Sequence, residues 1–282
     1  MIPAIGYALR EQNRPIFDDP AIDAVEVTFE RADDPLRVER YIGGLDVRYA
    51  SIHALKLSPG SPDPPSEQYL ARLKDIALEN DARSISDHLG FTRDGAHGTE
   101  LGHFAPVPPT RAALDATSRN VDAIVEYFAP LEFYIETIAY LFRLRGEMSE
   151  AEFLRKLLTR TGCGLLLDVT NVYANSRNFG FDARQFIDEV LPAAASVQMH
   201  LAGGFFDDQA AMYIDSHSHP VPAEVWDLYR HSLRRAREKV SAVFIERDQN
   251  FPDEAGWRDE IQTARKIAEQ VASEEETVLE PR

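Results

Sequence analysis

The chain has 282 residues, of which 44% are hydrophobic and 10% aromatic, so its composition is that of a globular protein with a sizeable core. Its formal net charge of -17 argues against duplex nucleic acid as the main partner, because that binding relies on Lys and Arg to neutralise phosphates. The single cysteine, Cys163, cannot form an internal disulfide, and the first residues contain neither a basic leader nor an apolar run of membrane-spanning length. We therefore predict a cytoplasmic protein that contacts no membrane.

Short apolar runs rich in β-forming residues recur along the chain, and helical segments separate most of them. The candidate strands are residues 3–10, 24–30, 47–53, 84–89, 132–137, 164–169, 196–201 and 242–247. The clearest candidate helices are residues 65–81, 110–128, 148–162 and 223–240. Before the second strand, residues 18–24 predict one helical turn at most. Strands that alternate with helices indicate a parallel sheet, and eight such units favour a closed (β/α)₈ TIM barrel of class α/β.

Local signals define one helix and the limits of the domain. Ser149 followed three residues later by Glu152 is typical of a capping box, and Gly162 of a helix C-cap. We expect a single barrel domain over residues 1–273 and an acidic, frayed tail over 274–282. Long loops rich in Pro and Gly are expected at 56–66, after the third strand, and at 90–110, after the fourth.

Six consecutive predicted strands end in a side chain that can bind metal, at the rim where barrels of this kind carry their chemistry. These residues are His53, His88, Glu136, Asp168, His200 and Glu246. Asn171 lies three residues past Asp168, and the loop after the seventh strand adds Asp215 and His217. Taken singly, each is more often a hydrogen-bonded or ion-paired rim residue. Burying all of them together is costly unless cations compensate the charge, so the pattern predicts a metal centre.

The donor types restrict the metal. All candidates offer imidazole nitrogen or side-chain oxygen, which suits iron, manganese or zinc and disfavours copper(I) or an iron–sulfur cluster. The donors exceed what one ion needs, and Glu136 and Glu246 could bridge, so two or three ions are expected. The residues do not choose between iron and zinc.

Other candidates have plainer interpretations. His97 and His103 are expected to be lid or surface residues, His231 to face solvent, and Cys163 to be a packing residue. His219, beside Pro220, has a doubtful part in any metal site. No nucleophile elbow, phosphate-binding loop or dinucleotide glycine motif is present in the sequence.

Seven motifs carry a family resemblance. They are "SIHALKLS", "SDHLGF", "RTGCGLLLDVTNVY", "NFGFD", "QMHLAGG", "YIDSHSHPVPAEVWDLY" and "FIERD". Their order and spacing resemble those of the multinuclear non-haem iron-dependent oxidases, relatives of the methanobactin and 3-thiaglutamate biosynthesis enzymes, over nearly the whole chain. The resemblance implies a xylose-isomerase-like TIM barrel with two or three irons in mixed Fe(II)/Fe(III) states and O₂ as co-substrate. It implies modification of a cysteine, or of an acidic or amide residue, in a ribosomally made precursor peptide.

The resemblance also implies roles for particular residues. The family's metal ligands correspond by position to His53, His88, Glu136, Asp168, Asn171, His200, Asp215, His217 and Glu246. Asp248 corresponds to an acid proposed to assist proton transfer, and a small partner protein is expected to hold the leader of the precursor. Thr137 departs from the family, which typically has Asn there.

Two other interpretations remain open. Endonuclease IV-like and sugar-isomerase-like barrels place His, Glu and Asp on the same strand ends. Against the nuclease, Asn171 stands where that pattern has His, and the acidic composition opposes DNA binding. A non-catalytic metal- or peptide-binding protein is the alternative from another class.

Overall fold

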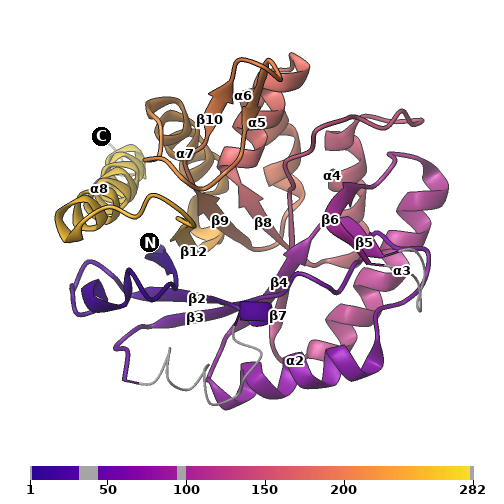
Figure 1. The fold of residues 1–282 in the computed structure, drawn as a ribbon, viewed down its shortest axis with the longest axis horizontal. Coiled ribbons are helices and arrows are strands. Elements are labelled where there is room, and N and C mark those ends of the chain that lie inside the picture. The colour runs from indigo at the N-terminus through magenta and orange to yellow at the C-terminus, as the bar shows by residue number, and fades with distance from the viewer. Residues whose placement is uncertain (1, 32–43, 94–99, 280–282) are drawn as a thin grey trace.

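The computed structural model describes residues 2–31, 44–93 and 100–279 (Figure 1). Eight parallel strands close into a barrel in the order β1, β12, β9, β8, β7, β4, β3, β2. Their bounds are β1 Ala4–Ala8, β2 Ala24–Thr28, β3 Tyr49–His53, β4 Ser84–His88, β7 Glu132–Glu136, β8 Gly164–Asp168, β9 Val197–Leu201 and β12 Val240–Ile245. The predicted single-domain TIM barrel and its eight strands are therefore confirmed.

Helices follow most of the strands and cover the outside of the barrel. Their bounds are α2 Glu67–Glu79, α3 Arg111–Phe128, α4 Glu150–Thr161, α5 Val169–Phe179, α6 Ala183–Val190, α7 Ala223–Ala236 and α8 Glu254–Leu279. The four predicted helices are confirmed as α2, α3, α4 and α7. Among the helices that the structure describes, none combines the length and apolar character needed to cross a membrane.

The one-turn helix expected at residues 18–24 is wrong in position. The turn lies upstream, as the 3₁₀ helix η1 Arg14–Ile16, and residues 18–24 contain only turns before β2 begins. Pro15 explains the shift, because its fixed φ suits the first turn of a helix and its missing N–H is not needed there.

Helix α4 ends where the sequence predicted. The Ser149 hydroxyl accepts a hydrogen bond from the backbone N–H of Glu152 at 3.1 Å, and Gly162 is a left-handed C-cap with φ of 66°. The Glu152 carboxylate does not complete a reciprocal box. It accepts a hydrogen bond from Lys156 Nζ at 2.6 Å instead.

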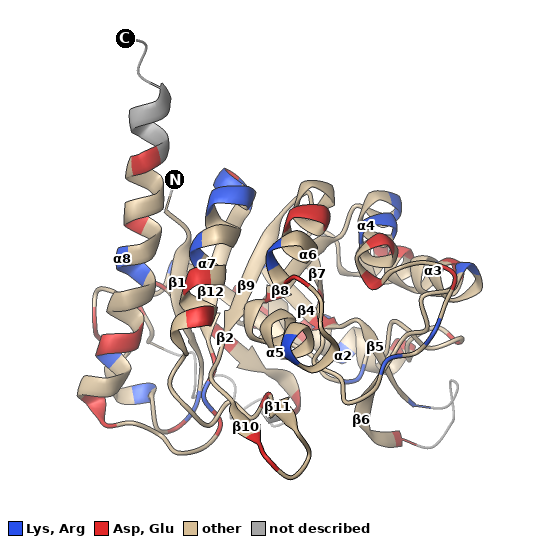
Figure 2. Cartoon of the chain, turned by 90° about the horizontal axis from the view of Figure 1, so that it is seen from above, with Lys and Arg blue, Asp and Glu red and all other residues tan. Residues whose placement is uncertain are grey.

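Two hairpins extend from the C-terminal end of the barrel. The predicted 90–110 loop contains β5 Gly90–Arg93 and β6 Glu100–Pro106, which pair antiparallel, so its irregular assignment is corrected. The connection after β9 contains β10 Phe205–Asp207 and β11 Met212–Ile214, also antiparallel. Both hairpins project from the same side of the barrel (Figure 2). They form raised walls beside the strand ends that bear the candidate metal residues.

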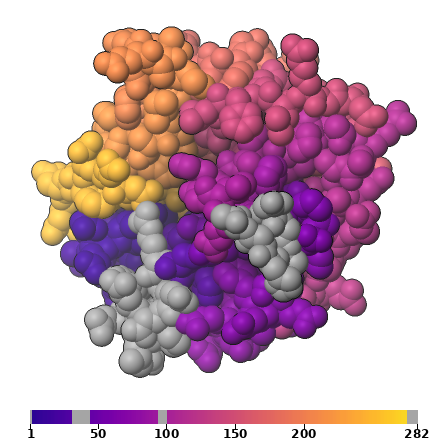
Figure 3. All heavy atoms as spheres, turned by 45° about the vertical axis from the view of Figure 1, so that its right-hand side comes forward, coloured from indigo at the N-terminus to yellow at the C-terminus, as the bar shows by residue number. Residues whose placement is uncertain are grey.

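The last helix packs beside the first strand. Helix α8 packs against β1 and α7, so the first and last coloured segments are adjacent on the surface (Figure 3). Trp257, in α8, is buried and meets the Tyr7 ring edge to face at a centroid distance of 5.0 Å. Helix α8 continues to Leu279 and so includes residues 274–279 of the segment predicted as a tail.

Candidate metal centre

His and carboxylate side chains lie at the C-terminal ends of six barrel strands. The strands run parallel, so these ends meet at one rim, where His88 pairs in register with Glu136 and Asp168 with His200. His53 ends β3, and Glu246 directly follows β12. Five of these six residues are buried, and His88 is half-buried.

The first group of donors joins β3, β4 and β7. One carboxylate oxygen of Glu136, Oε2, lies 3.5 Å from Nε2 of His53 and 3.5 Å from Nε2 of His88. The other ring nitrogen of His53, Nδ1, lies 2.9 Å from the Ser86 hydroxyl, which fixes the orientation of the ring. These three residues form a group that could hold a metal ion.

Shared carboxylates connect this group to its neighbours. The second oxygen of Glu136, Oε1, lies 3.4 Å from Nδ1 of His200, and the same nitrogen lies 3.1 Å from Glu246 Oε2. Two further groups that could hold metal are therefore Glu136 with Asp168 and His200, and Asp168 with His217 and Glu246. Glu136 and Asp168 each belong to two of these three groups, which is the arrangement that bridging carboxylates require.

Sequence reasoning missed Glu26, which completes a fourth group. Glu26 lies within β2, is fully buried, and places Oε1 2.9 Å from His200 Nε2. It forms a potential metal group with His200 and Glu246. A signal was present in "AVEVTFE": Val25 and Val27 belong to the apolar core, so the alternating residue between them faces the other side of the sheet.

Many buried polar atoms of these residues lack hydrogen-bond partners. Within the described residues, such atoms include both oxygens of Glu26, both ring nitrogens of His200, His88 Nδ1, Glu136 Oε2, Asp168 Oδ2, Asn171 Oδ1 and Asp215 Oδ1. Buried polar groups are almost always paired in native proteins. A concentration of unpaired donors and acceptors at one rim is what a set of metal ligands would show.

The separations between these atoms agree with that interpretation. Ligands about 2.1 Å from a shared ion lie roughly 3 to 3.4 Å from one another. Nδ1 of His200 lies 3.1 Å from Glu246 Oε2, and the other ring nitrogen, Nε2, lies 2.9 Å from Glu26 Oε1, yet neither nitrogen satisfies the geometry of a hydrogen bond. The two nitrogens diverge from one ring, so the two contacts cannot belong to the same ion. The residues present therefore fit a cluster of metal ions.

Asn171 and Asp168 are held by the start of α5. Asp168 caps the helix by accepting a hydrogen bond from Asn171 N at 2.8 Å, and this leaves its other oxygen, Oδ2, unpaired. The Asn171 amide donates to the backbone carbonyl of Thr137 at 3.0 Å, which turns the amide oxygen away from that carbonyl. Thr137, the departure from the family pattern, thus positions Asn171 through its backbone.

A strained loop presents Asp215 and His217. His217 has a positive φ of 49°, and its Nε2 lies 3.1 Å from Asp215 Oδ2. The loop passes very close to Gly203, where an added Cβ would lie 2.1 Å from the His219 carbonyl oxygen. The same glycine accepts a hydrogen bond from Ser218 N at 3.0 Å. Gly203, the first of the two glycines in "QMHLAGG", is therefore needed for the backbone of "YIDSHSHP" to pass this close.

Arg10 and Asp248 form an outer layer beside His217. Arg10, just beyond β1, donates from Nε to Asp248 Oδ1 at 2.8 Å and lies 3.9 Å from Glu246. The other Asp248 oxygen, Oδ2, lies 3.3 Å from His217 Nδ1. Sequence reasoning proposed Asp248 but missed Arg10, whose partner lies 238 residues away.

Burial and mutual charge shift the pKa values of the centre. Burial lowers the pKa of His53 and of His88 to about 3, so both rings are neutral and able to donate a lone pair. Burial likewise raises the pKa of Glu136 to about 8. Burial opposes charge on His200, but Glu246, Glu26 and Glu136 around it raise its pKa. In the metal-free protein, protons thus take the place of cations in this cluster.

The centre opens into a cavity of about 440 Å³. All nine predicted ligands except His200 line this cavity, together with Asp248 and Arg10. Phe104 stacks on His88 at a centroid distance of 3.7 Å, and His103 also lines the wall, which agrees with a place near the opening. The space is large enough for a side chain of a substrate.

The remaining candidates lie outside the centre. His219 is exposed, lies 5.6 Å from the Phe205 ring, and does not line the cavity. His231 contacts Asp188 at 3.0 Å near the surface, and Cys163 is buried in the core. His97 falls outside the described residues.

The fold and this cavity define a xylose-isomerase-like TIM barrel whose C-terminal rim carries groups able to hold metal ions. The chain belongs to the family described as "RiPP precursor modification enzyme MbnB/TglH/ChrH", which matches residues 4–269. A RiPP is a ribosomally synthesised and post-translationally modified peptide. The match confirms the family resemblance of the seven motifs.

Similar proteins agree with this assignment. A UPF0276 protein of Rhizorhabdus wittichii is 37% identical over 255 residues, covering 88% of this chain and 87% of its own length. An L-ribulose 3-epimerase structure has a TM-score of 0.60 at 15% identity, covering 100% of this chain and 99% of its own. A xylose isomerase-like TIM barrel protein from Mycobacterium smegmatis, in complex with magnesium, has a TM-score of 0.58 at 14% identity over 96% and 98% of the two chains. At such identities the structural likeness concerns the fold alone.

Proposed function

We propose that this protein is an O₂-dependent multinuclear iron oxidase that modifies a cysteine, or an aspartate or asparagine, of a ribosomal precursor peptide. The observation that carries the proposal is the set of buried, unpaired His and carboxylate atoms in groups linked through Glu136 and Glu246. Membership of a family of RiPP precursor modification enzymes supports the substrate class.

We assign the metal ligands to the nine residues predicted from the sequence and add Glu26. The nine are His53, His88, Glu136, Asp168, Asn171, His200, Asp215, His217 and Glu246. Two or three irons would account for the number of donors and for the shared carboxylates. When bound, iron supplies the electrons and open coordination positions that activate O₂.

The surrounding residues orient these ligands and handle protons. Burial acts to raise the pKa of Asp248, but its hydrogen bond with His217 and the charge of Arg10 lower it to about 2. Asp248 is therefore ionised at neutral pH, so it can accept a proton or hold His217 in place, but it cannot donate one. Arg10 keeps the Asp248 carboxylate directed at His217 Nδ1.

Exposed apolar side chains beside the cavity support docking of a small leader-binding partner. Leu141 and Phe142, after β7, are 68% and 55% exposed, and Phe205 and Phe206, on β10, are 40% and 52% exposed. Leu141 itself lines the metal cavity, as do Tyr213 and Ile214 of β11, the strand paired with β10. Apolar side chains gathered at an opening are typical of protein contact surfaces. We propose a heterodimer over this rim, in the cytoplasm and without nucleic acid.

Metal analysis after anaerobic purification tests the proposal, together with co-expression of short open reading frames next to the gene. Two to three irons per chain and an O₂-dependent mass change in a co-expressed peptide would support it. Tightly held zinc with phosphodiesterase activity would instead favour the endonuclease-like alternative. A metal-replete protein that consumes no O₂ with any such peptide would favour a binding role.

A further inference from the structure

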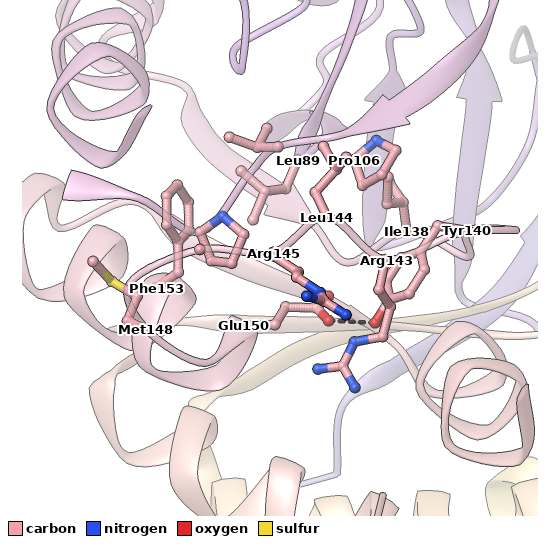
Figure 4. Close-up of a pocket in the computed structure, with 13 residues that line it drawn as sticks. Leu89, Pro106, Ile138, Tyr140, Arg143, Leu144, Arg145, Met148, Glu150 and Phe153 are labelled. Carbon is pink, nitrogen blue, oxygen red and sulfur yellow. Dashed lines mark hydrogen bonds between the residues drawn. The ribbon is translucent and has the colours of Figure 1, made fainter. Parts of the chain in front are cut away.

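A second cavity adjoins the metal centre. It has a volume of about 470 Å³ and shares two wall residues, Ile138 and Tyr140, with the metal cavity (Figure 4). A smaller third cavity of about 170 Å³ shares Arg143 and Glu150 with the second. Each of the three cavities therefore shares wall residues with the next, in the order metal cavity, second cavity, third cavity.

Hydrogen bonds within the chain hold the walls of the second cavity in place. The backbone N–H groups of Glu147 and Met148 both donate to the Pro109 carbonyl, at 3.0 and 3.2 Å. On the side facing the metal cavity, the Tyr140 hydroxyl donates to Glu150 at 2.5 Å. A preformed site loses less conformational entropy on binding, so this geometry suits ligand recognition.

The lining combines apolar surface with cationic groups. Leu89, Leu144, Met148 and Phe153 line the cavity, with Met148 and Phe153 on the side opposite Tyr140 in Figure 4. Arg143 and Arg145 line it as well. Both guanidinium groups are exposed, and neither forms an ion pair with a carboxylate in the described part of the chain. Arg143 lies over the Phe179 ring at 5.9 Å, and its charge acts on Glu150, a carboxylate that also lines this cavity. The two arginines outnumber that single carboxylate, which favours an anionic ligand in a chain of net charge -17.

We propose, resting on the proposed peptide substrate, that the second cavity binds an apolar side chain next to the reacting residue and that Arg143 and Arg145 pair with an adjacent carboxylate of the same peptide. An extended peptide advances about 3.3 Å per residue and alternates its side chains, so neighbouring residues can occupy cavities that share a wall. The site thus selects a peptide segment with an apolar residue beside an acidic one.

Defined peptides test the proposal without requiring any chemistry. The probe is capped Gly-Gly-Leu-Glu-Gly-Gly, with two matched peptides in which Leu is replaced by Ser or Glu by Gln. Saturation-transfer NMR titrations with both the metal-free and the as-purified protein give dissociation constants. The Leu-Glu peptide should bind at least about tenfold more tightly than the Ser-Glu peptide, as burial of a leucine side chain predicts. It should also bind more tightly than the Leu-Gln peptide.

Matched variants assign the contacts. Leu144→Glu should remove the preference for Leu, whereas Leu78→Glu, at an exposed leucine of α2, should leave it unchanged. The Arg143→Gln/Arg145→Gln protein should bind the Leu-Glu and Leu-Gln peptides equally. The Arg155→Gln/Arg184→Gln control, at exposed arginines of α4 and α6, should retain the difference.

Three outcomes would overturn the proposal: equal affinities for the three peptides, identical behaviour of Leu144→Glu and Leu78→Glu, or no binding at about 10 mM peptide. The experiment depends on neither bound iron nor O₂, because the metal-free protein is titrated as well. If the oxidase test fails and the peptide preference holds, the cavity is a peptide site serving another activity. If the preference fails and the oxidase test succeeds, substrate selection lies elsewhere.

Discussion

The carboxylate of Glu26 on β2 lies 2.9 Å from the imidazole of His200 on β9, across the interior of the barrel. Strands β1 and β12 separate the two strands in the sheet, so the contact is not made between neighbours. Glu26 thereby adds a side chain of β2 to the cluster that the ends of the later strands form.

Glu26→Gln should lower metal affinity, because the amide removes one anionic donor and leaves His200 without its partner. We expect metal affinity to fall by about 10- to 100-fold, the usual effect of removing a group that supports a metal ligand. Metal content after dialysis against a graded chelator series measures it, with circular dichroism to establish folding. Glu79→Gln, at an exposed position of α2, is the control. Equal metal retention by both variants would exclude Glu26 from the centre.

His217→Ala should lower the iron content and abolish peptide modification without unfolding the barrel, because His217 belongs to a donor group with Asp168 and Glu246. His219→Ala should retain both properties, since that side chain is exposed and lies outside the cavity. Iron analysis and mass spectrometry of the co-expressed peptide measure the two effects. Loss of activity in His219→Ala with survival in His217→Ala would reverse the assignment.

Asp248→Asn separates proton transfer from metal binding. The variant should keep its iron, because Asp248 belongs to none of the donor groups found among the described residues. Its turnover should fall by about 10²- to 10⁴-fold if the carboxylate accepts a proton during the reaction. Iron content and single-turnover rates over a pH series measure the two properties. Unchanged turnover would show that Asp248 takes no part in catalysis. Loss of iron would show that Asp248 acts by holding the ligand His217 in place.

Glu30 should make the folded protein less stable as pH rises. Burial raises its pKa to about 7, against an ordinary value of 4.5, and the charge of Asp87 acts in the same direction. The folded state therefore holds a proton that the unfolded chain has lost between about pH 4.5 and 7. The free energy of unfolding falls through that interval, by about 1 to 3 kcal/mol for such a shift.

Urea unfolding of the wild type and of Glu30→Gln at pH 5, 6, 7 and 8 measures this contribution. The difference between the two proteins should change through the interval and become constant above pH 8. Tyr69, which donates a hydrogen bond to Glu30, can donate equally to the amide, so the variant should fold. Parallel curves at every pH would show that Glu30 titrates normally.

The sequence predicted the strand-end residues well because the topology of a parallel barrel alone places them. Once eight βα units are recognised, His53, Glu136 and His200 must share a rim. Glu26 was missed because it lies inside a strand, where only the alternation of faces decides its direction. Arg10 was missed because its role depends on Asp248, which is distant in the chain and near only after closure of the barrel.

The hairpins and the second cavity were beyond sequence reasoning for a related reason. Gly and Pro in residues 90–110 indicate turns, but the pairing of β5 with β6 depends on tertiary context. The cavity is formed by Leu89, the 143–148 segment and Phe153, which no periodicity connects. Its existence follows from how the β7–α4 connection is tied to Pro109.

The place of β12 beside β1 has a consequence for the order in which the donor groups can form. The donor group of Glu26, His200 and Glu246 draws on both ends of the chain, and β12 must insert between β9 and β1 before those side chains meet. A chain that still lacks β12 has no Glu246, so neither group that includes this residue can form before the last strand is in place, whereas the groups built on Glu136 need no part of β12.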